Sequence, residues 1–221
     1  MSTPLALRAG SVDKLARFVA NQLRSLYPGD DADTDLAQLA AVVPAALARM
    51  EPIVAQVRNF RAGQFDHLHS LQYATFLYLV ANESWRAQPQ GDLAPRLFCL
   101  NRALNAIDLF YSVAMPEVFF ISHGLSAVLG NAVYGERLVI FQNTTVGRVG
   151  DERPELGRGV VLFPGATVTG NARVGDNAVI AAGTVVHGAD VPPDTVAIRA
   201  GGKLTFRPRG QDFQDLYFRS A

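Results

Sequence analysis

Cysteine, lysine and tryptophan are scarce in this chain, and the scarcity of cysteine excludes two kinds of covalent or metal cross-link. The only cysteine among the 221 residues is Cys99, so an internal disulfide and a cysteine-based zinc site are excluded. Cys99 lies in an apolar stretch and is expected to be a small buried hydrophobic side chain. Lysine occurs only at Lys14 and Lys203, so nearly all of the positive charge is carried by arginine.

An excess of charge of either sign is also missing. Twenty basic residues balance twenty acidic ones, which argues against a nucleic-acid-binding protein, because such proteins depend on a basic surface. No run approaches the roughly 18 apolar residues of a membrane span, and residues 1–14 lack the basic and apolar segments of a signal peptide. With 49% hydrophobic and 18% charged residues, the chain is expected to be globular and cytoplasmic.

The first half has the apolar spacing of helices. Ser11 is expected to cap a helix that ends before Pro28, and the stretch 30–60 is expected to be helical but divided by Pro44 and Pro52. Two further helices are predicted over 66–85 and 96–109. This pattern ends near residue 112.

The second half has a period of six, which fits neither a strand nor an α-helix. Such a period is typical of a left-handed parallel β-helix, in which each turn buries its inner side on the next. We therefore predict an α+β chain with a helical domain over 1–112, a β-helix over 113–203 and a tail over 204–221. The large residues are Val128, Tyr134, Ile140, Val146, Leu156, Leu162, Val168, Val174, Ile180 and Val186; the small ones two positions earlier include Ser126, Ala132, Thr144, Ala166, Ala172, Ala178 and Thr184.

The period is broken once, between Val146 and Leu156, where ten positions replace six. The charged segment 147–154 must leave the coil as a loop. Loops on a rigid scaffold are favoured places for binding groups, so we expect this loop to take part in function.

Four histidines are available for chemistry: His67, His69, His123 and His187. His123 precedes the regular coil and stands beside Gly124, which leaves room for a ligand; its neutral pKa suits a general base. From position alone, a structural role for His123 is equally expected. His67 and His69 are two apart near a predicted helix start, on different helix faces, so a shared metal is not expected. His187 is expected at a surface corner.

A catalytic metal is not predicted. The β-helical carbonic anhydrases use three histidines on neighbouring turns, whereas the coil here holds only His123 and His187, which are 64 residues apart. The usual three protein ligands of a catalytic zinc are therefore missing.

With these residues in view, the chain resembles the serine acetyltransferase family of hexapeptide acyltransferases. The likeness begins at His69-Ser70-Leu71-Gln72 and runs through Asp108 and the coil to Lys203. The matching pieces are Ser122-His123-Gly124 to Gly130, Thr145-Val146-Gly147, Asp151-Glu152-Arg153-Pro154, 180–186 and 190–193.

This resemblance implies acetyl transfer from acetyl-CoA to serine, and with it a place in cysteine biosynthesis. His123 corresponds to the family's catalytic histidine, and Asp108, fifteen residues earlier, to the aspartate that orients it. It implies further that CoA lies in a groove between neighbouring coils of a trimer. The corresponding cofactor-binding residues are Gly147, Gly165, Ala182, Gly183 and Lys203.

The chain departs from the family on the acceptor side. Ser122 stands where the family has an acidic residue, Asn131 where it has a glutamate, and Glu152-Arg153 where it has Arg-His. Arg153 could still bind a carboxylate or a phosphate. The expected acceptor-binding residues are Ser122, Asn131, Arg153, Asp151 and His69.

Three functions remain open at this point. The first is O-acetylation of serine or a related small hydroxyl compound. The second is acetylation of a nucleotide sugar or amino sugar for surface polysaccharides, because Ser122 and Asn131 are neutral. The third is a non-catalytic trimeric homologue that binds a partner through its helical domain or its aromatic tail. A homotrimer, or a dimer of trimers, is expected in each case.

Overall fold

A computed structural model describes residues 5–219 in two compact units. The helical unit comprises the residues up to Ala55, Phe60–Ala106 and Phe110–Ser112. The coil unit comprises Gln56–Asn59, Ile107–Leu109 and the residues from Val113 onward. Each unit is described by itself below.

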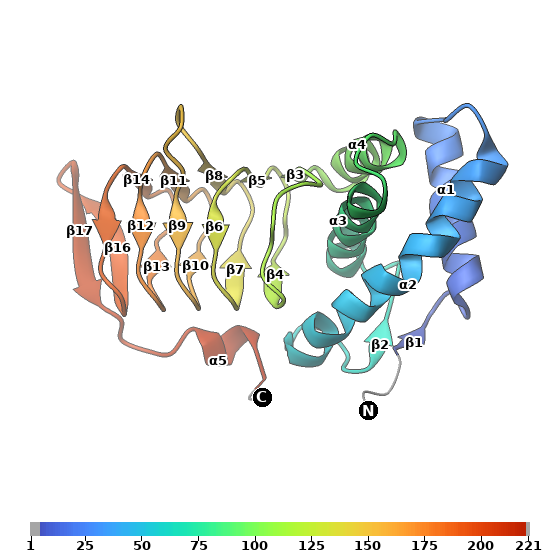
Figure 1. Cartoon of the computed structure of the whole chain (residues 1–221). Helices are drawn as coiled ribbons and strands as arrows, with labels where there is room; N and C mark the ends of the chain where they lie inside the picture. Colours follow the sequence, from blue (N-terminus) through green and yellow to red (C-terminus); the bar gives the residue numbers. More distant parts are fainter. Residues whose placement is uncertain (1–4, 220–221) are drawn as a thin grey trace. The chain divides into compact units, whose positions relative to one another are not determined.

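Four helices and one short parallel pair of strands build the helical unit (Figure 1). The strands β1 and β2 pair through Ala6 with Gln64 and Leu7 with Phe65. Helices α3 and α4 pack extensively against each other. The bounds are β1 Ala6–Leu7, α1 Val12–Leu26, α2 Ala32–Gln56, β2 Gln64–Phe65, α3 Ser70–Ala87 and α4 Leu93–Asn105.

The prediction for the first helix is confirmed. Ser11 is the N-cap of α1, and its hydroxyl accepts a hydrogen bond from the backbone N–H of Lys14 at 3.2 Å. This bond satisfies one of the free amides at the helix start. Leu15, Val19 and Leu23 are buried on one side of the helix.

The expected break in the second helix is wrong. Helix α2 runs without interruption through Pro44 and Pro52. Each proline removes one backbone donor and costs stability in a helix interior. The buried side chains of Val43, Met50 and Ile53 hold α2 in place, because tertiary packing supplies most helix stability.

The limits of the other two helices also differ from expectation. Helix α3 begins at Ser70, so His67 and His69 lie in the turn before it and not on helix faces. Helix α4 ends at Asn105, because Ala106 takes a left-handed conformation with φ of 52°, which is a common helix terminator. Asp108, predicted to be helical, therefore starts a strand.

Helix α2 also bears on the membrane question. By length and composition it could cross a membrane, with a mean hydropathy of 1.3 over its most apolar window. The same features occur in core helices, and 44% of that window is buried. The absence of a membrane span therefore stays a prediction.

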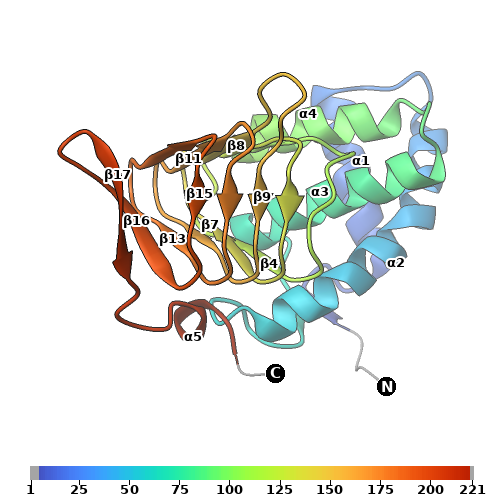
Figure 2. The ribbon, with the colours of Figure 1, turned by 60° about the vertical axis from the view of Figure 1, so that its left-hand side comes forward.

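The coil unit is a left-handed parallel β-helix with three faces (Figures 1 and 2). Face I contains β3 Asp108–Leu109, β5 Val128–Leu129, β8 Thr145–Gly147, β11 Thr167–Thr169 and β14 Val185–His187. Face II contains β6 Val133–Tyr134, β9 Glu155–Leu156, β12 Arg173–Val174 and β15 Asp190–Val191. Face III contains β4 Phe119–Ile121, β7 Leu138–Ile140, β10 Val161–Leu162, β13 Val179–Ile180, β16 Thr195–Ala200 and β17 Lys203–Pro208.

Nine of the ten predicted large residues form the narrow core, each at most 7% exposed. The exception is Val128, which is 40% exposed; its neighbour Leu129, at 1%, lies in register with Val146. The small residue of that turn is accordingly Ala127, with 0% exposure, and not Ser126, which is exposed. The phase error arises because Leu129 and the next core residue, Tyr134, are five residues apart and not six.

The outward side chains give each face a different character. Face II carries a ladder of Val133, Glu155, Arg173 and Asp190. Face I carries Asp108 and then only uncharged side chains: Val128, Thr145, Thr167 and Val185. Face III carries Phe120, Val139, Val161, Val179 and Val196.

The segment predicted as a tail from residue 204 is ordered structure within the coil unit. It begins inside β17, which pairs antiparallel with β16 at the end of face III. A short helix, α5 Gln214–Tyr217, follows below the strands (Figure 2). The aromatic residues Phe213, Tyr217 and Phe218 pack on this unit, whereas Phe206 and Leu216 remain exposed at 38% and 52%.

Candidate functional site

Two edges of the coil hold the residues that the sequence marks for function. The histidine edge, where face III turns into face I, comprises residues 122–126, 141–143, 163–165 and 181–183. The loop edge, where face I turns into face II, comprises residues 130–132, 147–154, 170–172 and 188–189. Face I lies between the two edges.

The first corner of the histidine edge is wider than the later ones. Four positions separate Ile140 from Thr144, Leu162 from Ala166, and Ile180 from Thr184. In the first turn, six positions separate Ile121 from Ala127, which occupies the place of those small residues. The two additional positions accommodate His123 and Gly124.

His123 is exposed on this wider corner and has a strained backbone. Its φ is 60°, a left-handed conformation that a residue with a Cβ adopts at a cost. Strain of this kind is often found at functional sites. The turn is closed by hydrogen bonds from Leu125 N–H to the His123 carbonyl and from Ala127 N–H to the Gly124 carbonyl.

Gly124 is required for this corner. A Cβ at that position would lie 2.7 Å from Cδ1 of Ile107 and 2.9 Å from Cγ2 of Ile121. Its φ of 35° adds to the demand for glycine. The sequence prediction was that Gly124 leaves room for a ligand beside His123, but Gly124 is buried and the space next to it is occupied by Ile107 and Ile121.

Asp108 is brought to the same corner by strand pairing. Its N–H donates to the carbonyl of Ala127 at 2.9 Å, and its Cα pairs with Val128. Leu109 is buried in the core, so Asp108 points outward, at the start of face I. The candidate catalytic pair thus belongs to one corner, with His123 in the turn before β5 and Asp108 on the strand paired with β5, although fifteen residues separate the two in sequence.

Ser122 lies immediately inside this corner. It is only 6% exposed, and its N–H donates to the carbonyl of Ile140 at 2.7 Å. The position before His123 is therefore a small, neutral and nearly buried side chain.

Most of the candidate cofactor residues continue the histidine edge away from His123. Backbone hydrogen bonds stack its corners: Asn143 donates to Leu125, Gly165 to Gln142, and Gly183 to Pro164, at 2.9, 3.0 and 2.9 Å. Gly165 and Gly183 have φ values of 73° and 66°. Ala182 and Gly183 are exposed, and a Cβ on Gly183 would meet nothing within 4 Å.

Lys203 extends the same edge by one more level. It follows the Gly201-Gly202 turn, and it pairs with Ala200 at the end of β16. Since β16 begins at the opposite edge and pairs with β13 on face III, its end lies on the histidine side. The Lys203 side chain is exposed there.

Sequence reasoning missed Gln142. This residue belongs to the second corner of the histidine edge, one turn from His123. Its Oε1 atom is buried and has no hydrogen-bond partner among the described residues. A polar residue at an otherwise apolar or small position, next to Phe141, is the signal that could have identified it.

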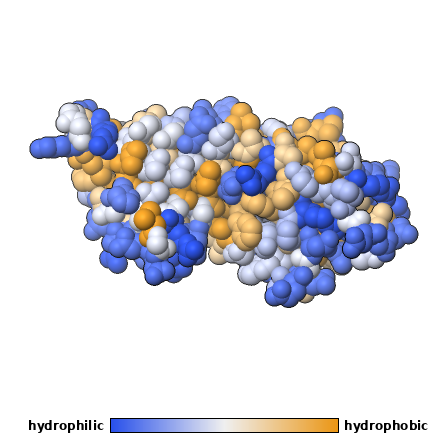
Figure 3. Space-filling model, turned by 90° about the horizontal axis from the view of Figure 1, so that it is seen from above, coloured by the Kyte–Doolittle hydropathy of each residue, from blue (hydrophilic) through white to orange (hydrophobic). Residues whose placement is uncertain are grey.

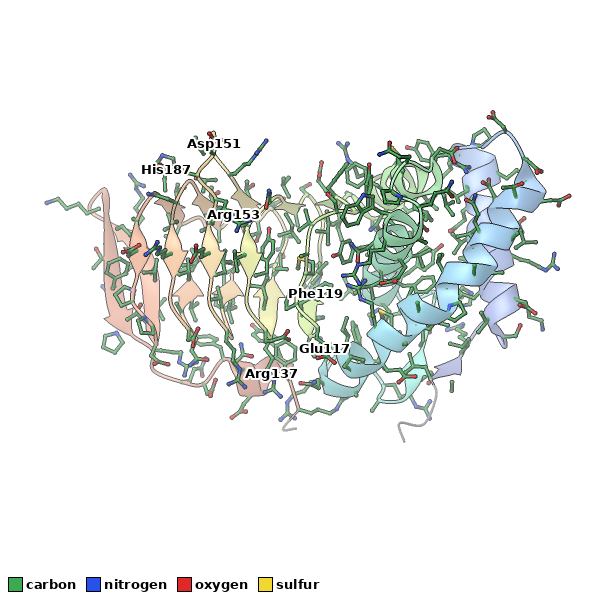
Figure 4. All side chains as sticks on the ribbon, in the orientation of Figure 1. Glu117, Phe119, Arg137, Asp151, Arg153 and His187 are labelled. Carbon is green, nitrogen blue, oxygen red and sulfur yellow. The ribbon has the colours of Figure 1, made fainter. Side chains whose placement is uncertain are left out.

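The remaining acceptor and cofactor candidates of the coil unit lie on the loop edge. The loop leaves the coil between β8 and β9 (Figure 1), and a bridge between Val149 and Glu152 closes it. The loop was predicted from the broken period, and that prediction is confirmed. Figure 4 shows Asp151 and Arg153 on it, both exposed. A Cβ on Gly130, next to the exposed Asn131, would lie 3.1 Å from the Val146 carbonyl and 3.4 Å from the Gly147 Cα.

His187 lies on the loop edge two turns further on. It is exposed, as predicted, and its Nδ1 lies 3.1 Å from Oγ1 of Thr169. Figure 4 places it on the same side of the coil as Asp151 and Arg153.

A single chain therefore brings together only part of the predicted site. His123, Asp108, Ser122, Gly165, Ala182, Gly183 and Lys203 belong to the histidine edge, whereas Asn131, Gly147, Asp151 and Arg153 belong to the loop edge. The surface between them is face I. It exposes Val128 and Val185, each at 40%, and Leu125 beside it at 59%. Seen from above in Figure 3, pale and orange residues cover much of the coil.

His69 belongs to the helical unit. It is the N-cap residue of α3, and its ring lies edge-on to Phe60 with centroids 5.3 Å apart. His67 lies edge-on to Phe18 at 4.8 Å. Burial lowers the pKa of His67 and outweighs the opposing effect of the Asp66 carboxylate. Among residues 5–219, no three His, Cys, Asp or Glu side chains gather as a metal site would require.

Comparison with known proteins supports the resemblance drawn from the sequence. The family described as "Bacterial transferase hexapeptide (six repeats)" matches residues 153–188. The serine acetyltransferase of Synechococcus elongatus is 33% identical over 145 residues, covering 62% of this chain and 59% of that protein. A probable serine acetyltransferase of Oryza sativa subsp. japonica is 34% identical over 169 residues, covering 72% of this chain and 55% of its own length.

The fold is shared with solved structures. A serine acetyltransferase in complex with CoA superposes with a TM-score of 0.66 at 19% identity, covering 88% of this chain and 83% of that one. The left-handed β-helix predicted from the six-residue period is therefore confirmed. The chain spans less than two thirds of the length of the two relatives above.

Proposed function

We propose that this chain is an acetyl-CoA-dependent O-acetyltransferase whose acceptor is serine. The observation that carries the proposal is the wider corner, which exposes His123 on a strained backbone and to whose end strand pairing brings Asp108. Support also comes from the similarity to serine acetyltransferases over more than 60% of the chain and from a neighbouring fold solved with CoA.

In the proposed reaction, the imidazole of His123 removes the proton from the acceptor hydroxyl. The hydroxyl oxygen attacks the thioester carbonyl carbon, and a C–O bond forms. The C–S bond then breaks, and the CoA thiolate receives the proton from the imidazolium. The products are the O-acetylated acceptor and CoA, and a general base of this kind contributes roughly a hundred- to ten-thousand-fold.

Asp108 is the positioning carboxylate in this proposal. A carboxylate beside a catalytic histidine fixes one tautomer and stabilises the imidazolium as it forms. Pairing of β3 with β5 brings Asp108 to the corner. Gly124 allows close packing of Ile107, the residue before Asp108.

Acetyl-CoA would lie along the histidine edge. Gly165, Ala182 and Gly183 are small residues at the third and fourth corners of this edge, and close approach of the backbone to a ligand is a usual role of glycine. Lys203 at the far end would contact an anionic part of the cofactor. The thioester would then point toward His123, at the other end of the same edge.

The acceptor site would be completed by a second copy of the chain. Within one coil, the width of face I lies between the histidine edge and the loop edge. Arg153 and Asn131 of a chain are therefore on the opposite side of face I from His123 of the same chain. A homotrimer would bring the loop edge of one coil to the histidine edge of the next. Pairing of trimers into a hexamer and a cytoplasmic location complete the proposal.

On the loop edge, Arg153 is the proposed partner of the acceptor carboxylate. Asp151 and Asn131 would lie near the other polar groups of the acceptor. Arginine can bind a carboxylate through two parallel hydrogen bonds.

One observation favours a second candidate function, acetylation of a neutral sugar hydroxyl. Ser122 beside His123 is uncharged and 6% exposed, and Asn131 is an amide. These side chains can donate to and accept from sugar hydroxyls but offer no negative charge to an ammonium group.

An acceptor screen separates the two. Thiol release from acetyl-CoA would be measured with serine, homoserine, an amino sugar and a nucleotide sugar, using wild type and His123→Ala. Turnover with serine that His123→Ala abolishes would support the first function, and turnover only with a sugar would replace it by the second. If wild type releases no thiol with any acceptor, the enzymatic proposal is wrong.

A further inference from the structure

The C-terminal strap, residues 209–219, lies across the outer side of face III. An ion pair from Arg209 to Asp194 at 3.4 Å joins its start to the coil, and a second one, from Arg209 to Asp212 at 3.2 Å, lies within the strap. The side-chain amide of Gln214, which is 9% exposed, donates to the carbonyl of Gly159 at 2.9 Å. The strap is therefore fastened to the coil along its length.

The end of the strap is tied to residues 56–59 of the coil unit. Arg58 N–H donates to the Tyr217 carbonyl at 2.8 Å, and Arg219 N–H donates to the Gln56 carbonyl at 2.7 Å. The guanidinium groups of Arg58 and Arg219 bind the carbonyls of Phe218 and Val57 at 2.9 and 2.6 Å. Phe218 is 1% exposed, and Arg137 lies over its ring.

The strap contacts the strand that leads into the wider corner. The Tyr217 ring lies 6.2 Å from that of Phe120 in β4 and 5.8 Å from that of Phe141, at the second corner. Phe120 is two residues before Ser122 and three before His123. Tyr217 thus bridges the turn that carries the candidate catalytic corner and the turn that follows it.

Strand β4 needs such support because it is the terminal strand of face III. Within the described residues it pairs with β7 alone, whereas β7, β10 and β13 each have strands on both sides. The Glu136 carboxylate holds the approach to β4 by accepting from the N–H groups of Glu117 and Val118 at 2.9 and 3.0 Å. Figure 4 shows Glu117 and Arg137 beside α5, at the lower end of the coil.

We infer that Tyr217 is a positioning residue for His123. By packing on Phe120 and Phe141, the strap fixes β4 and with it the corner on which His123 is exposed. The strap is in this view an integral part of the catalytic unit and not a free peptide for docking to another protein. The inference rests on the proposed acetyltransferase function for its kinetic consequence, and on the contacts above for its structural one.

The test compares Tyr217→Ala with Leu216→Ala, which changes the same helix at a side chain that is 52% exposed. Tyr217→Ala should lower kcat with serine by roughly tenfold or more, because small displacements of a catalytic group are costly. The KM for acetyl-CoA should stay within about twofold, because the rings that Tyr217 contacts belong to the first two turns and the later glycines to the third and fourth. Tyr217→Phe keeps the ring and should restore kcat, and Leu216→Ala should match wild type.

Amide hydrogen exchange gives a second measurement that does not depend on activity. Tyr217→Ala should accelerate exchange over residues 119–129 and leave exchange over 161–186 unchanged; Tyr217→Leu replaces it if the alanine variant fails to fold. An unchanged kcat in an active, folded Tyr217 variant, or unchanged exchange over 119–129, would overturn the inference. If wild type itself shows no turnover, the proposed function fails, and the exchange result alone then decides whether the strap fixes this corner.

Discussion

The first corner of the histidine edge and the three corners that follow it along the coil occupy equivalent places. Only the first departs from the repeat. At the later corners, the small residue comes four residues after the preceding core residue. At the first corner it comes six residues after. The later corners place Asn143, Gly165 and Gly183 in the left-handed conformation, as does the first with Ser126. What is added at the first corner is His123 and Gly124.

This difference shows where the scaffold ends and the chemistry begins. A hexapeptide coil is stable because every turn repeats the same contacts, so an inserted pair must be accommodated by local strain. His123, with φ of 60°, carries that strain. The regular corners, in contrast, repeat one backbone turn, and the last of them, Ala181-Ala182-Gly183, presents only small residues, on which a long cofactor can lie in the proposed function.

The most direct test of the difference between the corners is to remove the imidazole of His123. His123→Ala should lower kcat with acetyl-CoA and serine by roughly a hundred- to ten-thousand-fold. Its far-ultraviolet circular dichroism should remain that of wild type, because the side chain is exposed. His187→Ala, at an exposed position on the other edge, is the control and should leave the chemical step intact. Equal losses in both variants would contradict the assignment of His123.

The loop edge should respond in a different kinetic constant. Arg153→Ala should raise the KM for serine by roughly tenfold to a hundredfold, since a hydrogen bond to a charged group contributes about 1.5–3 kcal/mol. The KM for acetyl-CoA should change little. Arg173→Ala, which removes an exposed arginine from face II, provides the matched control. A rise in the KM for acetyl-CoA alone would move Arg153 to the cofactor side.

The regular corners can be tested with a pair of glycines. Gly183 and Gly63 both have positive φ, 66° and 72°, and a Cβ on either meets nothing within 4 Å. An alanine therefore costs similar backbone strain at both positions. Only Gly183→Ala should raise the KM for acetyl-CoA, by roughly tenfold, or about 1.4 kcal/mol. Steady-state kinetics with acetyl-CoA as the varied substrate would measure it, and an equal rise in Gly63→Ala would exclude a groove at Gly183.

The sequence was sufficient to predict the coil because its core residues repeat. Tyr134, Ile140 and Leu162 could be assigned to the interior without any three-dimensional information. Val128 was assigned wrongly for the same reason. The step from Leu129 to Tyr134 is five residues and not six, so extrapolating the period backwards from Tyr134 gives a position one residue too early.

Other features depend on contacts that are distant in sequence. Nothing in the local pattern shows that Tyr217 lies on Phe120, or that Arg219 binds the segment 56–59. The continuity of α2 through Pro44 and Pro52 likewise depends on the burial of Met50 and its neighbours. The pairing of Asp108 with Val128 required the end of α4 at Asn105, which the helical spacing through Ile107 concealed.

The smallest expected effect concerns the strain itself. A left-handed backbone costs a residue with a Cβ about 1–2 kcal/mol, less for asparagine, whereas glycine adopts it freely at a cost of about 0.5–1 kcal/mol in unfolded-state entropy. His123→Gly should therefore raise the free energy of unfolding by up to about 1 kcal/mol while abolishing turnover. Asn143→Gly, at φ of 58° in the second corner, should be nearly neutral, because asparagine already tolerates that conformation. Urea unfolding at one fixed protomer concentration would measure both. Stabilisation by Asn143→Gly but not by His123→Gly would mean that the first corner stores no more strain than the second, and that its additional residues serve only to place the imidazole.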